Sequence, residues 1–437
     1  MHALRILACV AACSMTVSLA SAHEPAVLEA GDGLSWYRGN MHTHSHWSDG
    51  DDYLESIALW YRDNGYQFLV FTDHNVLATT ERWVKVSKTK GGLTAYKKLK
   101  ENFPNWIEER GADEEVEVRL RQFVEVSGRL DQPGKFLLVQ GEEISDSHHG
   151  KPIHMNAHNV QELIPPQGGR SVQETIENNF RAVQAQREAT GQPMIIHLNH
   201  PNFGFAVTAE DLLRVRGEKF FEVYNGHPGV NNTGDEEHPG TERIWDIVLA
   251  QRIGALNLPM MYGLAVDDGH NYHDFPNRKS NPGRGWVMVL ANQLTPEALI
   301  ESLEHARFYA SSGVSLKRVA TDHDGMQVEV DPVPGETYTI EFVGTRNTTD
   351  LVGHPIEDEG DEPRHVTHRY SGGIGEVLKK VEGTSAEYKF SGDEYYVRAR
   401  ITSSAEHPNP SEVGDFKQAW VQPVLGPAAP KSAHEHE

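Results

Sequence analysis

The sequence predicts an α/β domain followed by a smaller antiparallel β domain. From Trp36 to about Ala310, short β-rich runs alternate with amphipathic helical stretches, which is the pattern of parallel strands joined by crossover helices. After Ser311 the segments become short and alternating and are punctuated by glycine, proline and aspartate, which is typical of a β-sandwich. A chain of 437 residues is long enough for both domains.

The first domain is expected to contain strands and helices in turn. Each expected strand is a short apolar run, and each expected helix has apolar residues at helical spacing. The strands cover residues 68–72, 136–140, 194–198, 220–224, 260–266 and 286–290. The helices cover residues 53–64, 172–188, 242–252 and 296–305.

Residues 80–133 lie between two of these strands and are rich in lysine and glutamate. We expect them to form a helical insertion packed beside the first domain, where it could act as a lid. The first domain is assigned to residues 23–310, the β domain to residues 311–425 and a disordered tail to residues 426–437. Strands of the β domain are expected at residues 326–330, 337–343, 387–390, 395–401 and 419–421.

Residues 1–22 have the features of a secretory signal peptide. Arg5 precedes an apolar run over residues 6–19, and Ala20-Ser21-Ala22 forms a cleavage site of small residues. The run is shorter than the roughly 20 apolar residues of a membrane-spanning helix, so an uncleaved anchor is the weaker alternative. We therefore expect an exported protein, periplasmic or secreted, without a membrane span after cleavage near His23.

Both cysteines, Cys9 and Cys13, fall inside this segment. The residues before Cys13 are faintly like a lipoprotein site, but this cysteine comes so early that plain export is favoured. The mature protein would then contain no thiolate, so any metal ion must be bound by nitrogen and oxygen.

The acidic composition limits the partners of the protein. A formal net charge of −23 argues against a nucleic-acid polymer, which requires a basic surface, and against an anionic membrane. It does not exclude a small anionic substrate, because bound divalent ions reverse the sign of the local field.

Histidines and carboxylates gather in short motifs. His42 and His44 are two residues apart in an extended segment, so their imidazoles project from the same face and can bind one cation together. Further candidate ligands stand at or just past the carboxyl ends of expected strands, where barrel enzymes assemble their active sites. They are His74, Glu143, His200, Asp268 and His270. The pattern predicts a polynuclear metal site that would accept Zn, Mn or Fe.

With these motifs the sequence resembles the polymerase and histidinol phosphatase (PHP) superfamily of metal-dependent hydrolases. The ordered set spans about residues 36–286 and consists of His42-Thr43-His44, Ser48-Asp49-Gly50, Thr72-Asp73-His74, Gly141-Glu142-Glu143-Ile144, His200-Pro201 and Asp268-Gly269-His270. The resemblance implies a distorted (β/α)7 barrel whose C-terminal mouth holds two or three divalent metal ions and hydrolyses phosphate esters. Some branches cleave carbamates, and residues 221–226, 266–268 and 419–423 look most like an exported branch that includes them.

The resemblance also implies which residues hold the first metal ion. His42 and His44 would be its ligands, Glu143 the bridging carboxylate and Asp268 the residue that closes the site. Glu142 competes with Glu143, but adjacent side chains diverge, and the Gly-x-Glu pattern favours Glu143.

Two further metal sites are implied in the same way. Asp49 and His74 would hold the second ion, and His154 and His200 would complete the third. His270 would return to the shared cluster.

Several neighbours of these motifs are assigned to other roles. His197 competes with His200, which the His-Pro dipeptide favours, and Asp267 is expected to accept hydrogen bonds behind Asp268. Asp73 is expected to orient a ligand. The remaining histidines near motifs are expected in loops or behind the ligands; they are His46, His148, His149, His158, His227 and His273.

The leading hypothesis is a phosphoesterase in which the metal ions activate water. The catalytic residues would be Asp268 in the metal site and His200 or His270, either of which could protonate the leaving alkoxide.

Three basic residues are candidates for binding the phosphate of a small-molecule ester. They are Lys151, Arg278 and Arg284, for which simple surface charge is an equally good interpretation.

Two rival functions use the same metal site. A carbamate, ester or amide hydrolase would attack a carbonyl, and a pocket of Trp47, Phe203, Phe205, Tyr224 and Tyr272 would suit its apolar substrate. A metal-binding or carbohydrate-associated module without turnover is the third possibility, with the β domain as its adhesive part.

Overall fold

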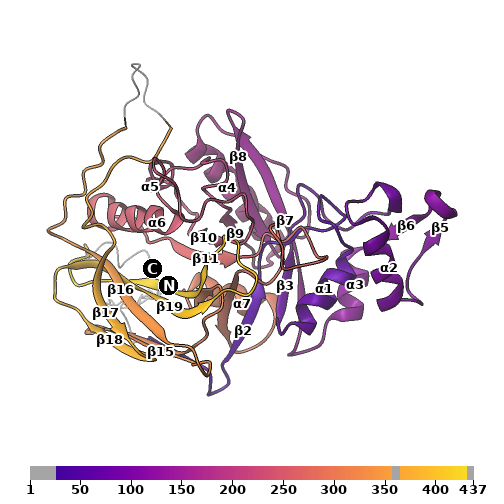
Figure 1. Ribbon diagram of the computed structural model, residues 1–437. Helices are drawn as coiled ribbons and strands as arrows, with labels where there is room; N and C mark the ends of the chain where they lie inside the picture. Colours follow the sequence, from indigo (N-terminus) through magenta and orange to yellow (C-terminus); the bar gives the residue numbers. More distant parts are fainter. Residues whose placement is uncertain (1–25, 357–364, 431–437) are drawn as a thin grey trace, which may run out of the picture.

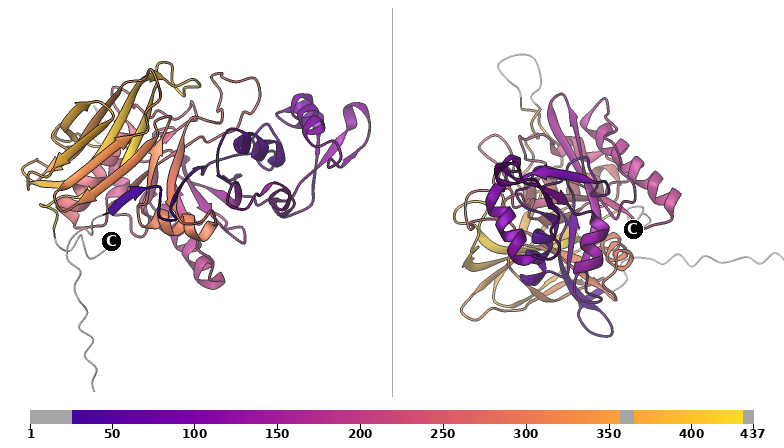
Figure 2. Two further views of the ribbon diagram at one scale, coloured as in Figure 1. Left: turned by 90° about the horizontal axis from the view of Figure 1, so that it is seen from below. Right: turned by 90° about the vertical axis from the view of Figure 1, so that its right-hand side faces the viewer.

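The computed structural model describes residues 26–356 and 365–430, so the expected signal peptide and residues 431–437 of the expected tail lie outside the described residues. An α/β domain and a β domain lie side by side, and residues 82–130 extend from the side of the α/β domain opposite to the β domain (Figures 1 and 2). Within the two described ranges, none of the helices combines the length and the hydrophobicity that a membrane crossing requires.

Each strand and helix expected in the α/β domain is present. The strands are β2 (Ser35–Asn40), β3 (Phe68–Phe71), β7 (Leu137–His148), β8 (Lys151–His158), β9 (Ile195–Leu198), β10 (Phe220–Asn225), β11 (Tyr262–Val266), β12 (Trp286–Ala291) and β13 (Phe308–Ser311). The helices are α1 (Leu54–Asp63), α4 (Val172–Thr190), α5 (Ala209–Leu213), α6 (Thr241–Ala250) and α7 (Pro296–Glu304). A π-helical turn, Gln251–Leu256, continues α6.

These strands and four of the β domain form a mixed sheet of 13 strands. The four are β16 (Tyr338–Arg346), β17 (Glu376–Glu382), β19 (Glu394–Glu406) and β20 (Phe416–Leu425). The order in the sheet is β11-β10-β9-β8-β7-β3-β2-β12-β13-β20-β19-β16-β17. Strands β2, β3 and β7 are parallel, as are β9, β10 and β11. Past the ends of β2 and β11, the chain makes an isolated bridge between Thr43 and Gly269, where His44 N donates to Gly269 O at 3.0 Å. This pairing establishes an α/β fold with a mixed sheet but does not confirm the closed (β/α)7 barrel.

The hairpin of β7 and β8 corrects the expected all-parallel arrangement. Strand β7 does not end at residue 140 but continues to His148, and β8 returns antiparallel to it. His149 and Gly150 have φ values of 49° and 78°, which is the backbone of a two-residue hairpin turn. A turn this short sends the chain straight back along its neighbour, so no crossover helix separates the two strands.

The insertion is not wholly helical as expected. It contains β4 (Arg82–Lys85), α2 (Gly92–Asn102), β5 (Glu109–Arg110), β6 (Glu117–Leu120) and α3 (Phe123–Leu130), and its strands form an antiparallel sheet in the order β4-β6-β5. Arg110 and Glu117 face each other across β5 and β6, with Nε and Oε2 2.6 Å apart. The charged residues therefore also form cross-strand pairs, which periodicity alone does not distinguish from helical ones.

The β domain contains β1 (Ala26–Glu29), β14 (Leu316–Asp322), β15 (Gly325–Val330), β16 (Tyr338–Arg346), β17 (Glu376–Glu382), β18 (Ser385–Lys389), β19 (Glu394–Glu406) and β20 (Phe416–Leu425). Strand β1 pairs with β14, so residues 26–29 belong to the sheet of the β domain, although they were assigned to the first domain. Residues 426–430 were assigned to the tail, but Gly426 N donates to Tyr395 O at 2.9 Å and Ala429 is buried.

Burial on both faces explains the apolar runs of the central strands. Every residue of β9, β10 and β11 is buried. Helix α4 begins at Ser171, whose side chain accepts a hydrogen bond from Glu174 N, and it ends at Gly191, which has a φ of 68°. These strands hold the residues that follow them in fixed positions at one end of the sheet.

Candidate metal centre

Nine side chains that the sequence identifies as candidate ligands meet at one end of the mixed sheet. Within each group of three or four, the candidate ligand atoms lie within 4.8 Å of one another. They come from the segments that follow β2, β3, β9 and β11 and from β7 and β8 themselves. The residues are His42, His44, Asp49, His74, Glu143, His154, His200, Asp268 and His270.

Four ligand atoms form a central cage, which we define as Nε2 of His42, Nε2 of His44, Oε2 of Glu143 and Oδ1 of Asp268. Nε2 of His42 lies 3.5 Å from the Glu143 oxygen and 3.3 Å from the Asp268 oxygen. The corresponding distances from Nε2 of His44 are 3.2 and 3.3 Å. A tetrahedral ion with bonds of about 2.0–2.1 Å has ligand atoms roughly 3.3–3.4 Å apart, so the cage has the spacing of such a site.

Polar atoms of the central cage lack hydrogen bonds. Nε2 of His42, Nε2 of His44 and Oε2 of Glu143 are buried without a hydrogen-bond partner, and so are Oδ1 of Asp49 and Nδ1 of His154. Buried polar atoms are nearly always paired because leaving them unpaired is costly. Cations bound in the groups to which these atoms belong would satisfy all five, so the residues present fit metal ions.

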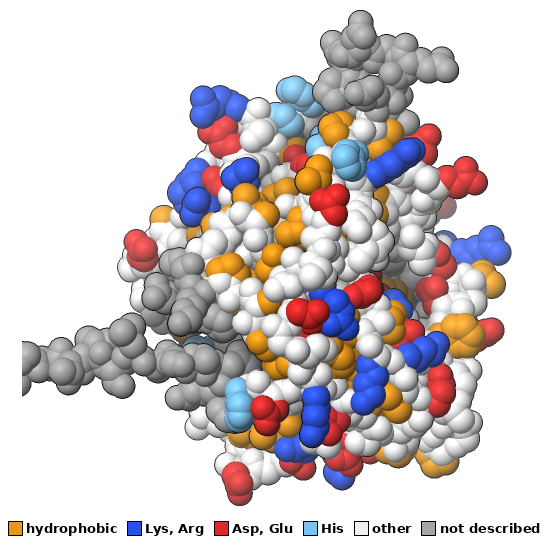
Figure 3. All heavy atoms as spheres, turned by 90° about the vertical axis from the view of Figure 1, so that its left-hand side faces the viewer, with side chains coloured by type: hydrophobic (Ala, Val, Ile, Leu, Met, Phe, Trp, Pro, Cys, Tyr) orange, Lys and Arg blue, Asp and Glu red, His pale blue; other side chains and the backbone are white. Residues whose placement is uncertain are grey.

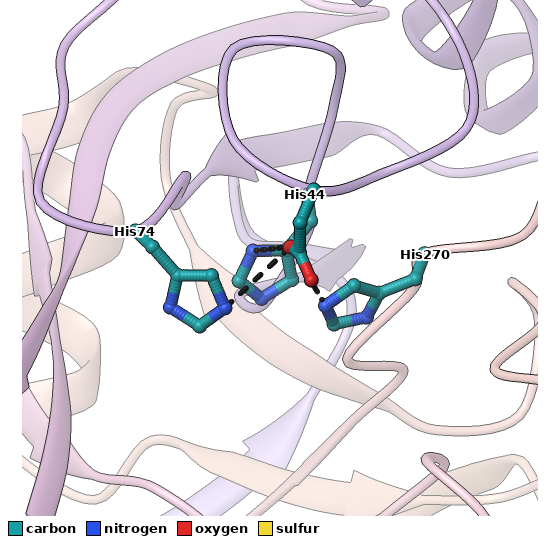
Figure 4. Close-up of side chains that lie close together, drawn as sticks. His44, His74 and His270 are labelled. Atoms are coloured by element: carbon teal, nitrogen blue, oxygen red, sulfur yellow. Dashed lines mark ion pairs between the residues drawn. The ribbon is translucent and has the colours of Figure 1, made fainter. Parts of the chain in front are cut away.

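A second group surrounds Asp49. Its Oδ1 lies 3.5 Å from Nε2 of His74, 3.2 Å from Nε2 of His270 and 3.7 Å from Nδ1 of His44. The three imidazoles point toward one another around this position (Figure 4). Nδ1 of His270 lies 2.9 Å from Asp268 O and can donate to it, which leaves Nε2 as the ligand nitrogen.

The third group uses the other oxygen of Glu143. Its Oε1 lies 2.8 Å from Nδ1 of His154 and 3.6 Å from Nε2 of His200. Glu143 therefore offers one oxygen to the central cage and the other to this group, as a bridging carboxylate would. Glu142 faces away and accepts a hydrogen bond from Ile164 N at 2.7 Å, and burial raises its pKa to about 8.

Glu222 is a functional residue that the sequence analysis did not identify. Its Oε1 accepts from Nδ1 of His42 at 2.7 Å and from Nε2 of His197 at 3.0 Å, and its Oε2 accepts from His200 N at 2.7 Å. A carboxylate that binds Nδ1–H of a histidine turns Nε2 toward a metal. The available signal was one acidic residue within the otherwise apolar, buried strand β10.

Two aspartates hold the loops that carry the ligands. Asp73 accepts from Ser45 N at 2.8 Å and from the Ser48 hydroxyl at 2.6 Å. Asp267 accepts from the Tyr61 hydroxyl at 2.7 Å and from Arg284 N at 2.6 Å. Both are therefore placed behind the ligands and not among them.

Protonation in the cluster is set by burial and by neighbouring charges. Burial lowers the pKa of His44 to about 3, so its imidazole is neutral at pH 7 and can bind a cation. Burial also acts to lower the pKa of His42, but nearby carboxylates, first Asp268, raise it well above its ordinary value. Burial would raise the pKa values of Glu143 and Asp268, yet the surrounding imidazoles lower both well below the usual range.

The three basic residues proposed to bind substrate are not brought together at the cluster. Arg284 is fully buried and donates to Gly226 O at 2.7 Å and to Asn277 O at 2.8 Å, so its geometry does not support phosphate binding. Arg278 is exposed, and Nζ of Lys151 donates to Phe205 O at 3.1 Å. The lysine that contacts a candidate ligand is instead Lys90 of the insertion, with Nζ 3.1 Å from Oδ2 of Asp49.

The aromatic pocket expected for a carbamate hydrolase is also dispersed. The ring of Phe203 lies 5.1 Å from that of His200, but Phe205 stacks on His238 at 3.7 Å and Tyr224 on Trp420 at 5.6 Å. The two remaining members, Trp47 and Tyr272, are buried.

No protein-family model matches the chain, and no curated protein matches it. Solved structures to which it is similar include a two-domain protein from Bacteroides vulgatus that contains a predicted PHP-like metal-dependent phosphoesterase. The two are 14% identical, and the match covers 90% of this chain and 96% of the other with a TM-score of 0.39. A protein from Bifidobacterium adolescentis, proposed to be a metal-dependent phosphoesterase, is also 14% identical, with 61% and 95% covered and a TM-score of 0.28. The assignment of a function therefore depends on the site itself.

Proposed function

We propose that this protein is an exported metal-dependent hydrolase that cleaves phosphate esters. The observation that supports the proposal most strongly is that buried nitrogen and oxygen atoms of the nine candidate ligands converge, several of them without a hydrogen-bond partner. The leader-like residues 1–22 support export. We further propose that β2, β3, β7, β8, β9, β10 and β11 form the distorted barrel of the PHP type, which the bridge between Thr43 and Gly269 supports.

The residues divide into three metal-binding groups. The central cage would hold one ion, Asp49 with His74 and His270 a second, and Glu143 with His154 and His200 a third. Bound divalent ions would supply a nucleophile from water at neutral pH and would neutralise charge on the substrate's oxygens. His200 and His270 are then ligands, so another side chain must stabilise the oxygen of the leaving group.

His227 is the imidazole we assign to hydrogen-bonding that oxygen. It is half-buried, and its ring lies 5.6 Å from the ring of His270. Its Nδ1 accepts a hydrogen bond from Gly229 N at 2.9 Å, so the neutral ring carries its proton on Nε2. Nε2–H is therefore available to donate a hydrogen bond to the oxygen that leaves and to stabilise the charge that develops on it, while water supplies the proton.

Metal analysis and paired hydrolysis assays test the proposal. The purified protein should contain at least two divalent ions per chain and should hydrolyse p-nitrophenyl phosphate. His44→Ala should abolish turnover without unfolding the protein, and His323→Ala, at an exposed histidine of the β domain, should leave turnover unchanged.

The same preparation is assayed with an aryl carbamate. Turnover of the carbamate alone would assign the site to the carbamate-hydrolase branch and reject the phosphoesterase. Bound metal without turnover of either substrate would identify a metal-binding module.

A further inference from the structure

A second cavity lies where the α/β domain meets the β domain. It has a volume of about 540 Å³ and is bordered by residues of β10, α6, β16, β19 and β20 and by the segment that precedes β20. None of the nine candidate metal ligands is among its lining residues. A cavity of this size holds a small molecule.

Two buried polar groups that border the cavity have no hydrogen-bond partner. Arg398 is 1% exposed, and its Nε and Nη2 bind Asp246 at 2.8 and 2.7 Å, but its Nη1 is unpaired. The hydroxyl of Tyr224, which is 7% exposed, is also unpaired. Both side chains belong to the lining, and each has a polar atom that the protein leaves unpaired.

The charges around the cavity favour an uncharged occupant. Arg398 and Arg400 border it together with Glu242, and Nη1 of Arg400 lies 3.0 Å from an oxygen of Glu242. Two further carboxylates, Glu412 and Asp415, border its other side. The carboxylates would repel an anion in the cavity, and the guanidinium groups would repel a cation. A hydroxyl group can instead donate to the carboxylates and accept from the guanidinium groups.

The cavity also has an aromatic border. Phe416 is 46% exposed although it is a large apolar residue, and Trp420 lies beside it in the lining. On the face of the molecule that carries the β domain, acidic and basic side chains are interspersed and neither sign predominates (Figure 3). An exposed ring beside convergent polar groups suits a ligand with one apolar face and several hydroxyl groups.

We propose that this cavity is a binding site for an uncharged saccharide, separate from the metal centre. The C–H face of a sugar ring would pack on Phe416, and its hydroxyl groups would pair with Arg400, Glu412 and Asp415. Strand β10 contributes to both sites, because it carries Glu222 at the metal centre and Tyr224 at the cavity.

Isothermal titration calorimetry of the full chain tests this site. The probes are glucose, galactose, maltose, cellobiose and N-acetylglucosamine, with glucuronate and glucosamine as charged counterparts. At least one neutral sugar should bind saturably, and more tightly than either charged sugar. Phe416→Ala and Glu412→Gln should each weaken binding by about tenfold, as expected for loss of one aromatic contact or one charge-assisted hydrogen bond.

Val413→Ala is the matched control. Val413 is 84% exposed, adjoins Glu412 and is not part of the lining. This variant should bind like the unaltered protein, and all three variants should retain hydrolytic activity. Absence of binding by every neutral sugar at 10 mM, tighter binding of a charged sugar, or binding unchanged by both Phe416→Ala and Glu412→Gln would each overturn the proposal.

Discussion

Replacing Glu222 with glutamine tests whether this residue orients the metal ligands. Glu222 accepts four hydrogen bonds, from His42, His197, His200 N and the Asn225 amide. Glutamine keeps the shape but has one accepting oxygen instead of two. Either the imidazoles of His42 and His197 or the backbone N–H of His200 therefore lose their acceptor. In either case Nε2 of His42 is positioned less firmly in the central cage.

The expected loss follows from the role of such carboxylates. Removing the acceptor behind a metal-binding histidine weakens metal binding by about 10–100-fold, which corresponds to about 1.4–2.7 kcal/mol. The loss should appear in metal affinity, measured by competition with a chromophoric chelator, and hydrolysis should recover at saturating metal.

Glu218→Gln is the matched control. Glu218 lies two residues before β10 and is 1% exposed, and it accepts from Lys219 N and Phe220 N. Burial raises its pKa to about 8, so at pH 7 it is mostly uncharged and glutamine resembles it closely. Metal affinity of this variant should equal that of the unaltered protein. Wild-type affinity in Glu222→Gln, or equal losses in both variants, would refute the orienting role.

Four further predictions concern the same region. Asp49→Ala should lower the metal content by about one ion per chain without unfolding, because Asp49 is partly exposed and lies outside the central cage; elemental analysis showing full content would contradict the second group. Burial acts to lower the pKa of His74, but Glu143 and Asp49 raise it to about 9. A metal ion must therefore displace the proton of His74, and metal affinity should rise between about pH 7 and pH 9. A metal affinity that does not change with pH, measured by chelator competition, would contradict His74 as a ligand. His227→Ala should slow hydrolysis of alkyl phosphates far more than that of p-nitrophenyl phosphate, whose leaving oxygen carries less charge; equal slowing would reject His227 as the hydrogen-bond donor to the leaving oxygen. Tyr61→Phe removes a hydroxyl that donates to Asp267 and accepts from Asn40. It should lower the free energy of unfolding, measured by urea titration, by about 1–3 kcal/mol. A decrease of less than about 0.5 kcal/mol would contradict a role of this hydroxyl in the buried network.

Local pattern was sufficient for six strands of the α/β domain, but β2, β8 and β13 were not expected, and Glu143, expected just past the end of a strand, lies within β7. The expected strand at 220–224 appears as Phe220–Asn225, and the expected helix at 172–188 appears as Val172–Thr190. The periodicity of a segment predicts which of its faces is buried, but it does not predict which strands pair or in which direction. Pairing direction depends on the turn, so the antiparallel return of β8 was missed.

The roles of charged residues were predicted less well than their positions. Arg284 follows a metal-type motif, yet its guanidinium binds backbone carbonyls inside the protein. Glu222 was noted only within the stretch 221–226 and was given no role, yet it contacts two imidazoles. Whether a charge faces a substrate, a metal ligand or a carbonyl depends on residues distant in the sequence.

The sequence by itself determined the chemistry that is available: imidazoles and carboxylates placed in or just past strands. Tertiary structure alone decided which atoms meet, such as the two oxygens of Glu143 facing different groups and Nε2 rather than Nδ1 of His42 facing the central cage. The physical reason is that an ion is held by atoms positioned to within tenths of an ångström. Such positions depend on strand register and on buried hydrogen bonds between segments up to 228 residues apart, as between Tyr272 and His44.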